Sequence, residues 1–290
     1  MTDYTIFAKG RTIPIHGRPL LMGIVNITPD SFFDGGRYLA VDRAVAQAEA
    51  LVEEGADILD LGAESTRPGA VPVDEQEEMG RLLPVLNEVV KRTSVPISID
   101  TMKSRVARAA LDSGASIIND VTAMRFDPEM ASVIAARKAA VVLMHMQGMP
   151  ATMQQAPRYH NVVLEVREFF DERIRAAEQA GIVKSHIVLD PGFGFGKLQV
   201  HNVELLNRLQ DFSGFGCPIL AGLSRKAFLG KILDRPAEER EWGTAAAVAL
   251  AVDRGAAIIR VHDVVSMKDV VRVAAAIRSA PVTIKQDHYA

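Results

Sequence analysis

The feature that most constrains the fold is a unit that recurs along the chain. Each copy has the end of a helical segment, a glycine, and a short apolar strand that finishes in polar residues. The clearest copies are EEGADILDLG at 53–62, DSGASIIND at 112–120, QAGIVKSHIVLD at 179–190 and DRGAAIIRVHD at 253–263. Glycine adopts the left-handed conformation that commonly ends a helix, and β-branched residues favour strands. The repeat therefore predicts alternating helices and strands.

Further apolar runs bring the number of expected strands to eight. They lie at 20–26, 95–100, 139–146 and 217–222. Apolar residues recur at helical spacing between the strands. Expected helices run from about 41 to Gly55, and at about 75–92, 103–113, 129–137, 162–180, 203–211, 225–233 with 238–254, and 267–279. Expected helix starts are Asp127–Pro128 and Ser266 with Asp269.

Eight alternations with nearly continuous apolar strands predict an α/β fold, a single (β/α)8 TIM barrel. An open doubly wound sheet is the alternative, which the similar length of the eight units disfavours. Alternating apolar residues at 4–16 predict a hairpin turned at Lys9–Gly10. The expected organisation is one domain over 1–290, with the hairpin in 1–18, the barrel in 19–280 and a tail in 281–290.

Charge and cysteine content exclude several classes of partner. The 33 basic and 36 acidic residues nearly cancel, so nothing favours a nucleic acid or an anionic membrane. Cys217 is the only cysteine, which excludes an internal disulfide and a multi-cysteine metal site. No window approaches about 18 uninterrupted apolar residues, and 1–10 lacks the features of a signal peptide. The sequence predicts a cytoplasmic protein.

The run from Ile187 to Lys197, IVLDPGFGFGK, joins a buried strand to a glycine-rich loop. Two phosphate-binding motifs fail on spacing. A dinucleotide fingerprint would need glycine where Lys197 stands, and a P-loop would need serine or threonine at Leu198. We interpret the glycines as backbone freedom that lets Phe193 and Phe195 point where the loop needs them. Asp190 cannot be buried without partners, so this strand end is expected to face a ligand cavity.

Polar side chains end every expected strand, and in such barrels the active site lies at the carboxyl ends of the strands. They are Asn26, Glu64 through Arg67, Asp100, Asn119 with Asp120, His145, Asp190, Ser224 through Lys226, and Arg260 with His262. So many polar groups at one mouth indicate a binding site. Asp120, His145 and Glu64 are open to either interpretation, as buried supports or as ligand contacts, whereas Asp100, Asn119 and Asp190 are expected to contact a ligand.

The chemistry of this set favours a flat nitrogen heterocycle. A carboxylate pairs with two parallel N–H donors, and amides both accept and donate. Arg260 and His262 are suited to a phosphate-bearing group, and Asn26 offers an oxygen to Mg²⁺. Lys226 suits either a charge beside a ring oxygen or a Schiff-base nucleophile, and the sequence leaves both open. The spacing of a protein-ligated catalytic zinc and a serine–glycine elbow are both absent from the sequence.

An ordered set of eight motifs over about 20–280 resembles bacterial dihydropteroate synthase. They are NITPDSFFDGG at 26–36, ESTRPGA at 64–70, SID at 98–100, IIND at 117–120, LMHMQG at 143–148, DPGFGFGK at 190–197, GLSRK at 222–226 and RVHDV at 260–264. Phe33 departs from the small residue expected in the first loop. The resemblance implies a TIM barrel that joins 6-hydroxymethyl-7,8-dihydropterin diphosphate to 4-aminobenzoate.

The resemblance also implies roles for individual residues. The pterin site would comprise Asp100, Asn119, Met144, Asp190, Gly222 and Lys226. The 4-aminobenzoate site would comprise Thr66, Arg67, Pro68, Phe195 and Ser224. The diphosphate would bind Asn26, Arg260 and His262, with Mg²⁺ on Asn26. The reaction would be carried by Asp100, Asp190, Lys226, Arg260 and His262.

The implied reaction is a dissociative substitution at the pterin methylene, which needs no strong general base because the aniline nitrogen is neutral near pH 7. A corrinoid-dependent methyltransferase acting on methyltetrahydrofolate is one alternative, and a pterin-binding homologue without catalysis is another. The TRPG loop and the SRK motif disfavour the former, and the intact RVH motif disfavours the latter. Sulfonamides are expected inhibitors, and a homodimer is expected from the family and from apolar residues on 267–279.

Overall fold

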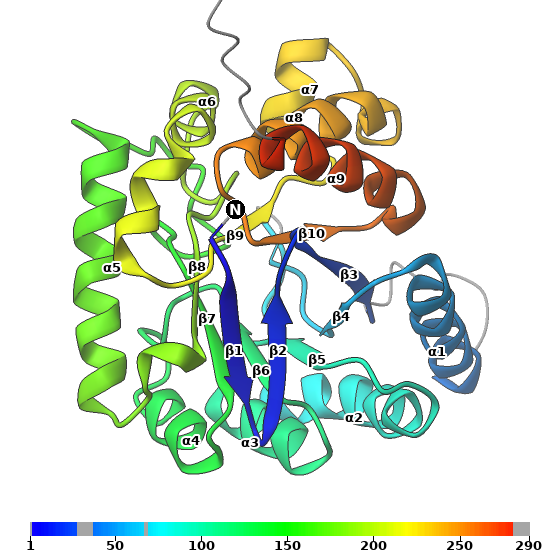
Figure 1. The fold of residues 1–290 in the computed structure, drawn as a ribbon. Helices are drawn as coiled ribbons and strands as arrows, with labels where there is room; N and C mark the ends of the chain where they lie inside the picture. Colours follow the sequence, from blue (N-terminus) through cyan, green and yellow to red (C-terminus); the bar gives the residue numbers. More distant parts are fainter. Residues whose placement is uncertain (1, 28–36, 67–68, 281–290) are drawn as a thin grey trace, which may run out of the picture.

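The computed structural model describes residues 2–27, 37–66 and 69–280 (Figure 1). An antiparallel hairpin precedes eight parallel strands, in the order β8-β7-β6-β5-β4-β3-β10-β9. The strands are β1 (Tyr4–Ala8), β2 (Arg11–Ile15), β3 (Leu20–Asn26), β4 (Ile58–Gly62), β5 (Ile97–Asp100), β6 (Ile117–Asp120), β7 (Ala140–Met144), β8 (Ile187–Asp190), β9 (Leu220–Gly222) and β10 (Ile258–Val261). The two edge strands meet where Leu189 bridges Ile219 and donates its N–H to the carbonyl of Pro218 at 3.0 Å. The predicted barrel is confirmed, and the doubly wound alternative is wrong.

Helices follow the strands and surround the barrel (Figure 1). They are α1 (Arg37–Glu54), α2 (Glu75–Arg92), α3 (Ser104–Asp112), α4 (Met130–Arg137), α5 (Val162–Gln179), α6 (Gln199–Asn207), α7 (Ala227–Leu233), α8 (Glu241–Asp253) and α9 (Val264–Ser279), with 3-10 turns η2 (Lys184–His186), η3 (Leu209–Phe215) and η4 (Ala237–Glu239). Gly55 follows α1 at φ +109°, as the glycine pattern predicts. Apolar side chains between the strands and the helices form the larger part of the core.

Helix starts were harder to predict than helix positions. The helix expected at 203–211 is α6, which begins at Gln199 and ends at Asn207. Ser266 does not start α9, which begins at Val264, and its hydroxyl instead donates to Glu241 at 2.6 Å. A tertiary partner, Glu241, therefore takes the Ser266 hydroxyl that the sequence assigned to a helix start.

The hairpin closes the amino-terminal end of the barrel. Its turn at Lys9 and Gly10 has positive φ at both residues, which is the geometry of a tight two-residue hairpin. Ile6 and Ile13 pack with Met22, Ile58 and other residues that point into the barrel, in one buried cluster. In Figure 1 the hairpin lies in front of the barrel strands. The hairpin therefore covers the barrel floor, and the opposite end is the place for a ligand site.

The alternation of side chains along each strand links this floor to the mouth. Residues two apart on a strand point to the same side. Stepping two residues from the floor leads from Ile58 to Asp60, from Ile117 to Asn119 and from Val188 to Asp190. The same step leads from Val142 to Met144, from Leu220 to Gly222 and from Ile258 to Arg260. The polar strand ends therefore point into the barrel at its carboxyl end.

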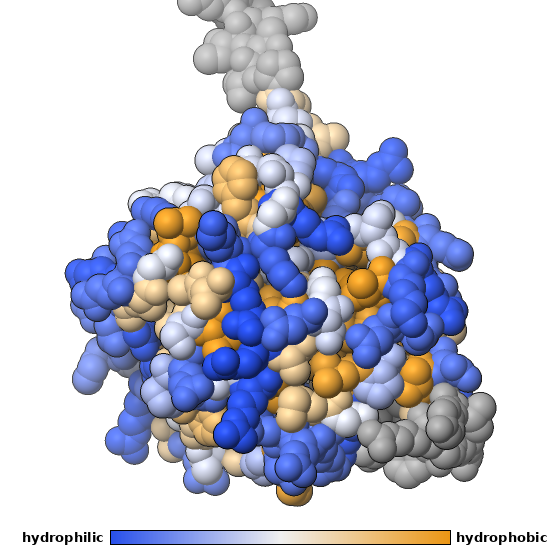
Figure 2. Space-filling model, turned by 90° about the horizontal axis from the view of Figure 1, so that it is seen from below, coloured by the Kyte–Doolittle hydropathy of each residue, from blue (hydrophilic) through white to orange (hydrophobic). Residues whose placement is uncertain are grey.

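The outer surface mixes charged and apolar side chains. Figure 2 views the molecule from below relative to Figure 1, and hydrophilic groups surround small apolar areas on that face. Within the described ranges, no helix combines the length and apolarity needed to cross a membrane.

Candidate active site

The deepest polar layer of the mouth centres on Arg260. Its Nε donates to Oδ2 of Asp60 at 2.6 Å, and its Nη2 donates to Oδ2 of Asp100 at 2.9 Å. Asp60 is completely buried, and Asp100 is nearly so. Burial raises the pKa of Asp100 to about 7, against the opposing charge of Arg260. The guanidinium thus links three strands and sits beside a carboxyl group that ionises near neutral pH.

Asn119 and Gly222 border space that a ligand can use. The side-chain amide of Asn119 donates to Asp60 at 3.1 Å, and its Oδ1 is buried with no hydrogen-bond partner in the described structure. A buried acceptor without a partner is costly and is satisfied when a ligand donates to it. A Cβ added to Gly222 would meet no atom within 4 Å, so the mouth is open beside Arg260.

Asp190 and Lys226 form the second charged pair of the mouth. Oδ1 of Asp190 accepts the N–H of Gly192 at 2.7 Å. Burial raises the pKa of Asp190, opposed by that hydrogen bond and by the charge of Lys226. Burial lowers the pKa of Lys226 to about 8, opposed by Asp190. The ammonium lies 4.4 Å from the ring centre of Phe195, a cation–π contact.

An apolar wall adjoins these charges. Met144, Met146, Met153 and Val121 form a small buried cluster, and the ring of Phe195 packs against it. Methionine side chains are adaptable and pack well against aromatic rings. One side of the mouth therefore suits the face of a flat ring, while the carboxylates suit its edge.

Ser224 and His262 lie just beyond the strand ends. The Ser224 hydroxyl and Nδ1 of His262 are 2.9 Å apart, and the backbone N–H of His262 donates to the same hydroxyl at 3.3 Å. Burial, with the charge of Arg260, lowers the pKa of His262 to about 4. The imidazole is therefore neutral at pH 7. When Nδ1 accepts from Ser224, the proton stays on Nε2 for a ligand.

The three residues that the sequence left open between support and ligand contact are all placed as supports. The Asp120 carboxylate accepts the N–H groups of Thr122 and Met124 at 2.7 and 2.8 Å. Glu64 pairs with Lys103 at 2.7 Å and accepts the N–H of Val73. His145 is buried with its Nδ1 2.9 Å from Nζ of Lys197. Each holds a loop rather than facing the mouth.

Three functional supports were missed in the sequence: Asp60, Lys103 and Lys197. Asp60 carried a signal, since a charged residue interrupts the apolar strand ILDLG two residues before its end. Lys103 lies between Glu64 and Glu78, at 2.7 and 2.5 Å, and Glu78 is completely buried. In the sequence, Lys197 stands out only as the lysine of an incomplete phosphate-loop pattern.

Several predicted residues lie in or beside parts that the structure does not describe. Arg67, Pro68 and Phe33 fall outside the described residues, as does most of the first loop. Thr66 and Asn26 are described and partly exposed. The roles predicted for these residues stay predictions.

A protein-only metal centre is not formed by the described residues, which contain no group of three or more histidine, cysteine, aspartate or glutamate side chains placed to hold an ion. Asn26 ends β3 at the mouth, pointing inward like Met22 and Ile24. Its side chain is partly exposed, so its amide oxygen can add one ligand to an ion that a substrate carries.

A closed parallel barrel with carboxylates, a lysine and an apolar wall at its mouth defines a class of enzyme that binds a flat heterocycle. The family model described as "Pterin binding enzyme" matches residues 22–262 and makes this class specific. The chain belongs to the dihydropteroate synthase family. It is 45% identical to the dihydropteroate synthase of Escherichia coli K12 over 275 residues, which cover 95% of this chain and 97% of the relative.

Two solved structures resemble the whole fold. One is dihydropteroate synthase from Xanthomonas albilineans with 4-aminobenzoic acid, with a TM-score of 0.90 and 47% identity, covering 97% of this chain and 100% of the other. The second is the Yersinia pestis enzyme in a sulfonamide drug complex, with a TM-score of 0.90 and 41% identity, covering 95% and 100%.

Proposed function

We propose that the protein is a transferase that joins 6-hydroxymethyl-7,8-dihydropterin diphosphate to 4-aminobenzoate, giving 7,8-dihydropteroate and diphosphate. The observation that carries this proposal is the arrangement of Asp190, Lys226 and Phe195 around one mouth: a buried carboxylate, an ammonium and an aromatic ring. The family membership supports it, as does the bound 4-aminobenzoic acid of the Xanthomonas structure.

The pterin is assigned to the deep part of the mouth. Gly192 binds Oδ1 of Asp190, so Oδ2 is available to accept a hydrogen bond from the amino-pyrimidine edge of the pterin. Asn119 and Asp100 complete that edge, and Lys226 lies near the ring oxygen. Met144 packs against the ring face, and the open space at Gly222 admits it.

The diphosphate is assigned to Asn26, Arg260 and the N–H of His262. Mg²⁺ fits this site as an ion held mainly by the diphosphate, because the protein offers it one amide oxygen and Mg²⁺ keeps several waters or phosphates as ligands. When bound, the ion offsets charge on the leaving group. Arg260 does the same through its guanidinium, and Asp60 and Asp100 hold that guanidinium in place.

The aminobenzoate is assigned to the outer part, between Phe195 and Ser224, with Thr66, Arg67 and Pro68 contributed by the second loop. Its neutral amine needs no strong base, so the residues act by orienting the two substrates and stabilising charge. Loss of diphosphate leaves a cation on the pterin methylene that the ring delocalises, and exclusion of water protects it. Sulfonamides, as mimics of 4-aminobenzoate, are expected to compete at this place.

The test is pteroate formation from the dihydropterin diphosphate and labelled 4-aminobenzoate, with and without Mg²⁺. Product that depends on both substrates and on the ion is the expected result. If calorimetry shows that a pterin binds but the assay yields no product, the result would contradict the synthase and favour the homologue that only binds pterin. Methyl transfer from methyltetrahydrofolate would favour the corrinoid enzyme. The reaction and the buried, unpaired Cys217 fit a cytoplasmic location.

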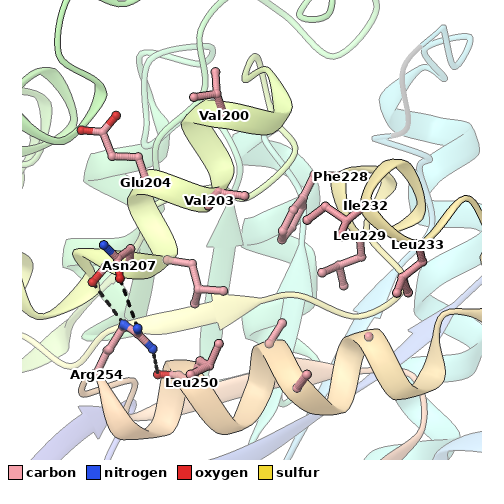
Figure 3. Close-up of a pocket in the computed structure, with 14 residues that line it drawn as sticks. Val200, Val203, Glu204, Asn207, Phe228, Leu229, Ile232, Leu233, Leu250 and Arg254 are labelled. Carbon is pink, nitrogen blue, oxygen red and sulfur yellow. Dashed lines mark hydrogen bonds between the residues drawn. The ribbon is translucent and has the colours of Figure 1, made fainter.

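A homodimer stays a proposal, and a groove between α6, α7 and α8 is the surface that suits it (Figure 3). The cavity measures about 580 Å³ and is lined mainly by apolar side chains. Val200, Ile232 and Leu250 on its rim are each about half exposed or more. The apolar residues at 267–279, from which the sequence predicted a dimer, lie on α9. Val271 among them is buried, whereas Val273 and Ile277 are exposed.

Light scattering tests this interface. Ile232→Asp should convert a wild-type dimer to monomer, because a carboxylate at a closely packed apolar contact loses its hydration. Leu164→Asp, an equally exposed leucine on α5, is the matched control and should leave the mass unchanged. A monomeric wild type would contradict the dimer.

A further inference from the structure

We propose that Lys197 is a positioning residue that fixes the backbone of the loop 190–197 against the segment 145–147, so that Asp190 and Phe195 face the substrates. The proposal rests on the proposed function, because it concerns the same site. It assigns Lys197 a role in the affinity for both substrates without contact with either.

The ammonium of Lys197 is surrounded by acceptors from both segments. Nζ lies 2.9 Å from Nδ1 of His145, 3.0 Å from the carbonyl of Gly192, 3.0 Å from the carbonyl of Phe195 and 3.2 Å from the carbonyl of His145. The residue is 3% exposed. Three N–H donors match the three shortest contacts, so Nζ has no donor left for a substrate.

The two segments pack backbone to backbone around this ammonium. A Cβ on Gly192 would lie 2.0 Å from the carbonyl oxygen of His145, and one on Gly196 would lie 2.5 Å from that of Gln147. Both glycines have positive φ. Without side chains in between, carbonyl oxygens from both segments converge on Nζ of Lys197. Burial lowers the pKa of Lys197 to about 7, opposed by the charge of Asp190, and the protonated form offsets the mutual repulsion of these carbonyls. This accounts for Gly192 and Gly196, two of the three glycines that no phosphate motif explains.

The contacts of Lys197 lead directly to the two ligand-facing residues. Gly192, whose carbonyl Lys197 holds, donates its N–H to the Asp190 carboxylate at 2.7 Å. His145 donates its backbone N–H to the carbonyl of Asp190 at 2.9 Å. Phe195, whose carbonyl Lys197 also holds, places its ring 4.4 Å from Nζ of Lys226. One buried ammonium therefore orders the backbone at both the pterin carboxylate and the outer aromatic ring.

His145 completes the arrangement from outside. Its ring packs edge-on against Phe169, with centroids 4.8 Å apart. Burial, followed by the charge of Lys197, lowers the pKa of His145 well below its usual value. A neutral His145 accepts on Nδ1 and keeps its proton on Nε2, which fits the donation from Lys197.

The experiment compares Lys197→Met with wild type by steady-state kinetics and by calorimetric titration with 6-hydroxymethylpterin. Methionine has an unbranched side chain one atom shorter than that of lysine and removes all three donors. We expect the KM for 4-aminobenzoate to rise about tenfold or more and pterin binding to weaken by a similar factor, since the interactions lost are made equally in ground and transition states. The kcat with both substrates saturating should fall by less than the KM values rise.

Ile6→Ala is the structural control, because Ile6 lies on the barrel floor at the end away from the mouth. It should lower the melting temperature and leave both KM values within about twofold of wild type. Lys197→Gln, which retains two donors, replaces the methionine variant if that fails to fold, and it should show a smaller rise in KM. n-Propylammonium, which matches the three carbons and the ammonium that Lys197→Ala removes, should lower the raised KM of that variant.

Three results would overturn the proposal. If Lys197→Met is destabilised but keeps the KM values of wild type, Lys197 contributes only to stability. Loss of kcat with both substrate affinities intact would mean that Lys197 acts on the reacting atoms. A rise in KM in Ile6→Ala equal to that in Lys197→Met would mean a general effect of destabilisation. Absence of pteroate from wild type would instead contradict the proposed function, and the pterin titration would still test Lys197.

Discussion

Arg260 donates from Nε to Oδ2 of Asp60 over 2.6 Å, although 200 residues separate them in the sequence. Asp60 also accepts from the amide of Asn119 at 3.1 Å, so one buried carboxylate orients side chains from β6 and β10. Being completely buried, Asp60 is out of reach of a ligand. It supports the two groups that a ligand would meet.

Asp60→Asn should therefore lower both stability and catalytic efficiency. An amide in place of the carboxylate leaves Arg260 with Asp100 as its one charged partner, and removing one partner of a buried ion pair costs about 3–5 kcal/mol. Urea unfolding measures the loss. Asp112→Asn, in an exposed pair with Arg137, is the control and should cost much less. A loss at Asp60 no larger than that at Asp112 would contradict the role.

Asp190→Asn tests the pterin edge. The variant replaces an acceptor of two donors with a mixed donor and acceptor, so transition-state stabilisation should fall by about 2–4 kcal/mol. That corresponds to a loss of about 30- to 900-fold in kcat/KM. The N–H of Gly192 can still bind the amide oxygen, so the loop should stay folded and the melting temperature should change little. A loss of under about tenfold would mean that the edge is recognised elsewhere.

The sequence predicted the barrel and most of its mouth because both follow from local patterns. Helices that end in glycine and apolar strands repeat along the chain. Because the strands are parallel, their last residues all lie at the same end of the barrel. Asp100, Asn119, Asp190 and Arg260 were identified in this way, and the structure brings them together at one mouth.

The sequence could not predict contacts that depend on distant partners. Lys197 meets His145, 52 residues away, and Lys103 meets Glu64, 39 residues away. The start of α6 was missed for a local reason. Its N-cap residue is the apolar Leu198, whose N–H donates to the ring of His201 at 3.1 Å, so no side chain of the usual capping type marks it.

Lys103→Met tests the support beneath the second loop. It leaves two glutamates, one of them completely buried, without their cation, and this should cost about 3–5 kcal/mol at pH 7. Burial already raises the pKa of Glu78. Without Lys103 the folded state takes up a proton there more readily than the unfolded state, so the deficit should shrink as the pH falls from 7 to 5. Lys91→Met, in an exposed pair with Glu88, is the matched control. A deficit independent of pH would contradict this account.

His262 should make stability depend on mild acid. Its pKa is about 4 when folded and 6.5 as the unperturbed value, so between these values the unfolded chain binds the proton and the folded chain does not. Stability is therefore fully present above pH 6.5 and falls as the pH drops towards 4, by at most about 3 kcal/mol. His262→Asn removes this titration, and the difference between its unfolding curve and that of wild type isolates it. Parallel curves from pH 7 to 4 would contradict the burial of the neutral ring.

Lys226 should set the alkaline limit of activity. Burial lowers the pKa of its ammonium to about 8, and a pterin ring oxygen is bound by the charged form. The charged form predominates below that pH and is lost above it. In the free enzyme, loss of this charge should therefore make kcat/KM fall above about pH 8, by about tenfold for each further unit. Lys226→Arg keeps a charge at all these pH values and should remove the alkaline fall, even if its larger head group lowers the maximum.

Lys226→Ala separates binding from covalent chemistry at the same position. If the ammonium binds the pterin, pterin affinity and turnover should weaken together, and borohydride should trap no adduct on the wild type. A Schiff-base role requires the neutral amine, so activity would rise, rather than fall, as the pH passes 8. The two roles therefore predict opposite slopes of the pH profile above pH 8 and opposite results of the trapping experiment. The neighbouring Asp190 and the ring of Phe195 both favour the charged amine, which is why we expect the alkaline fall.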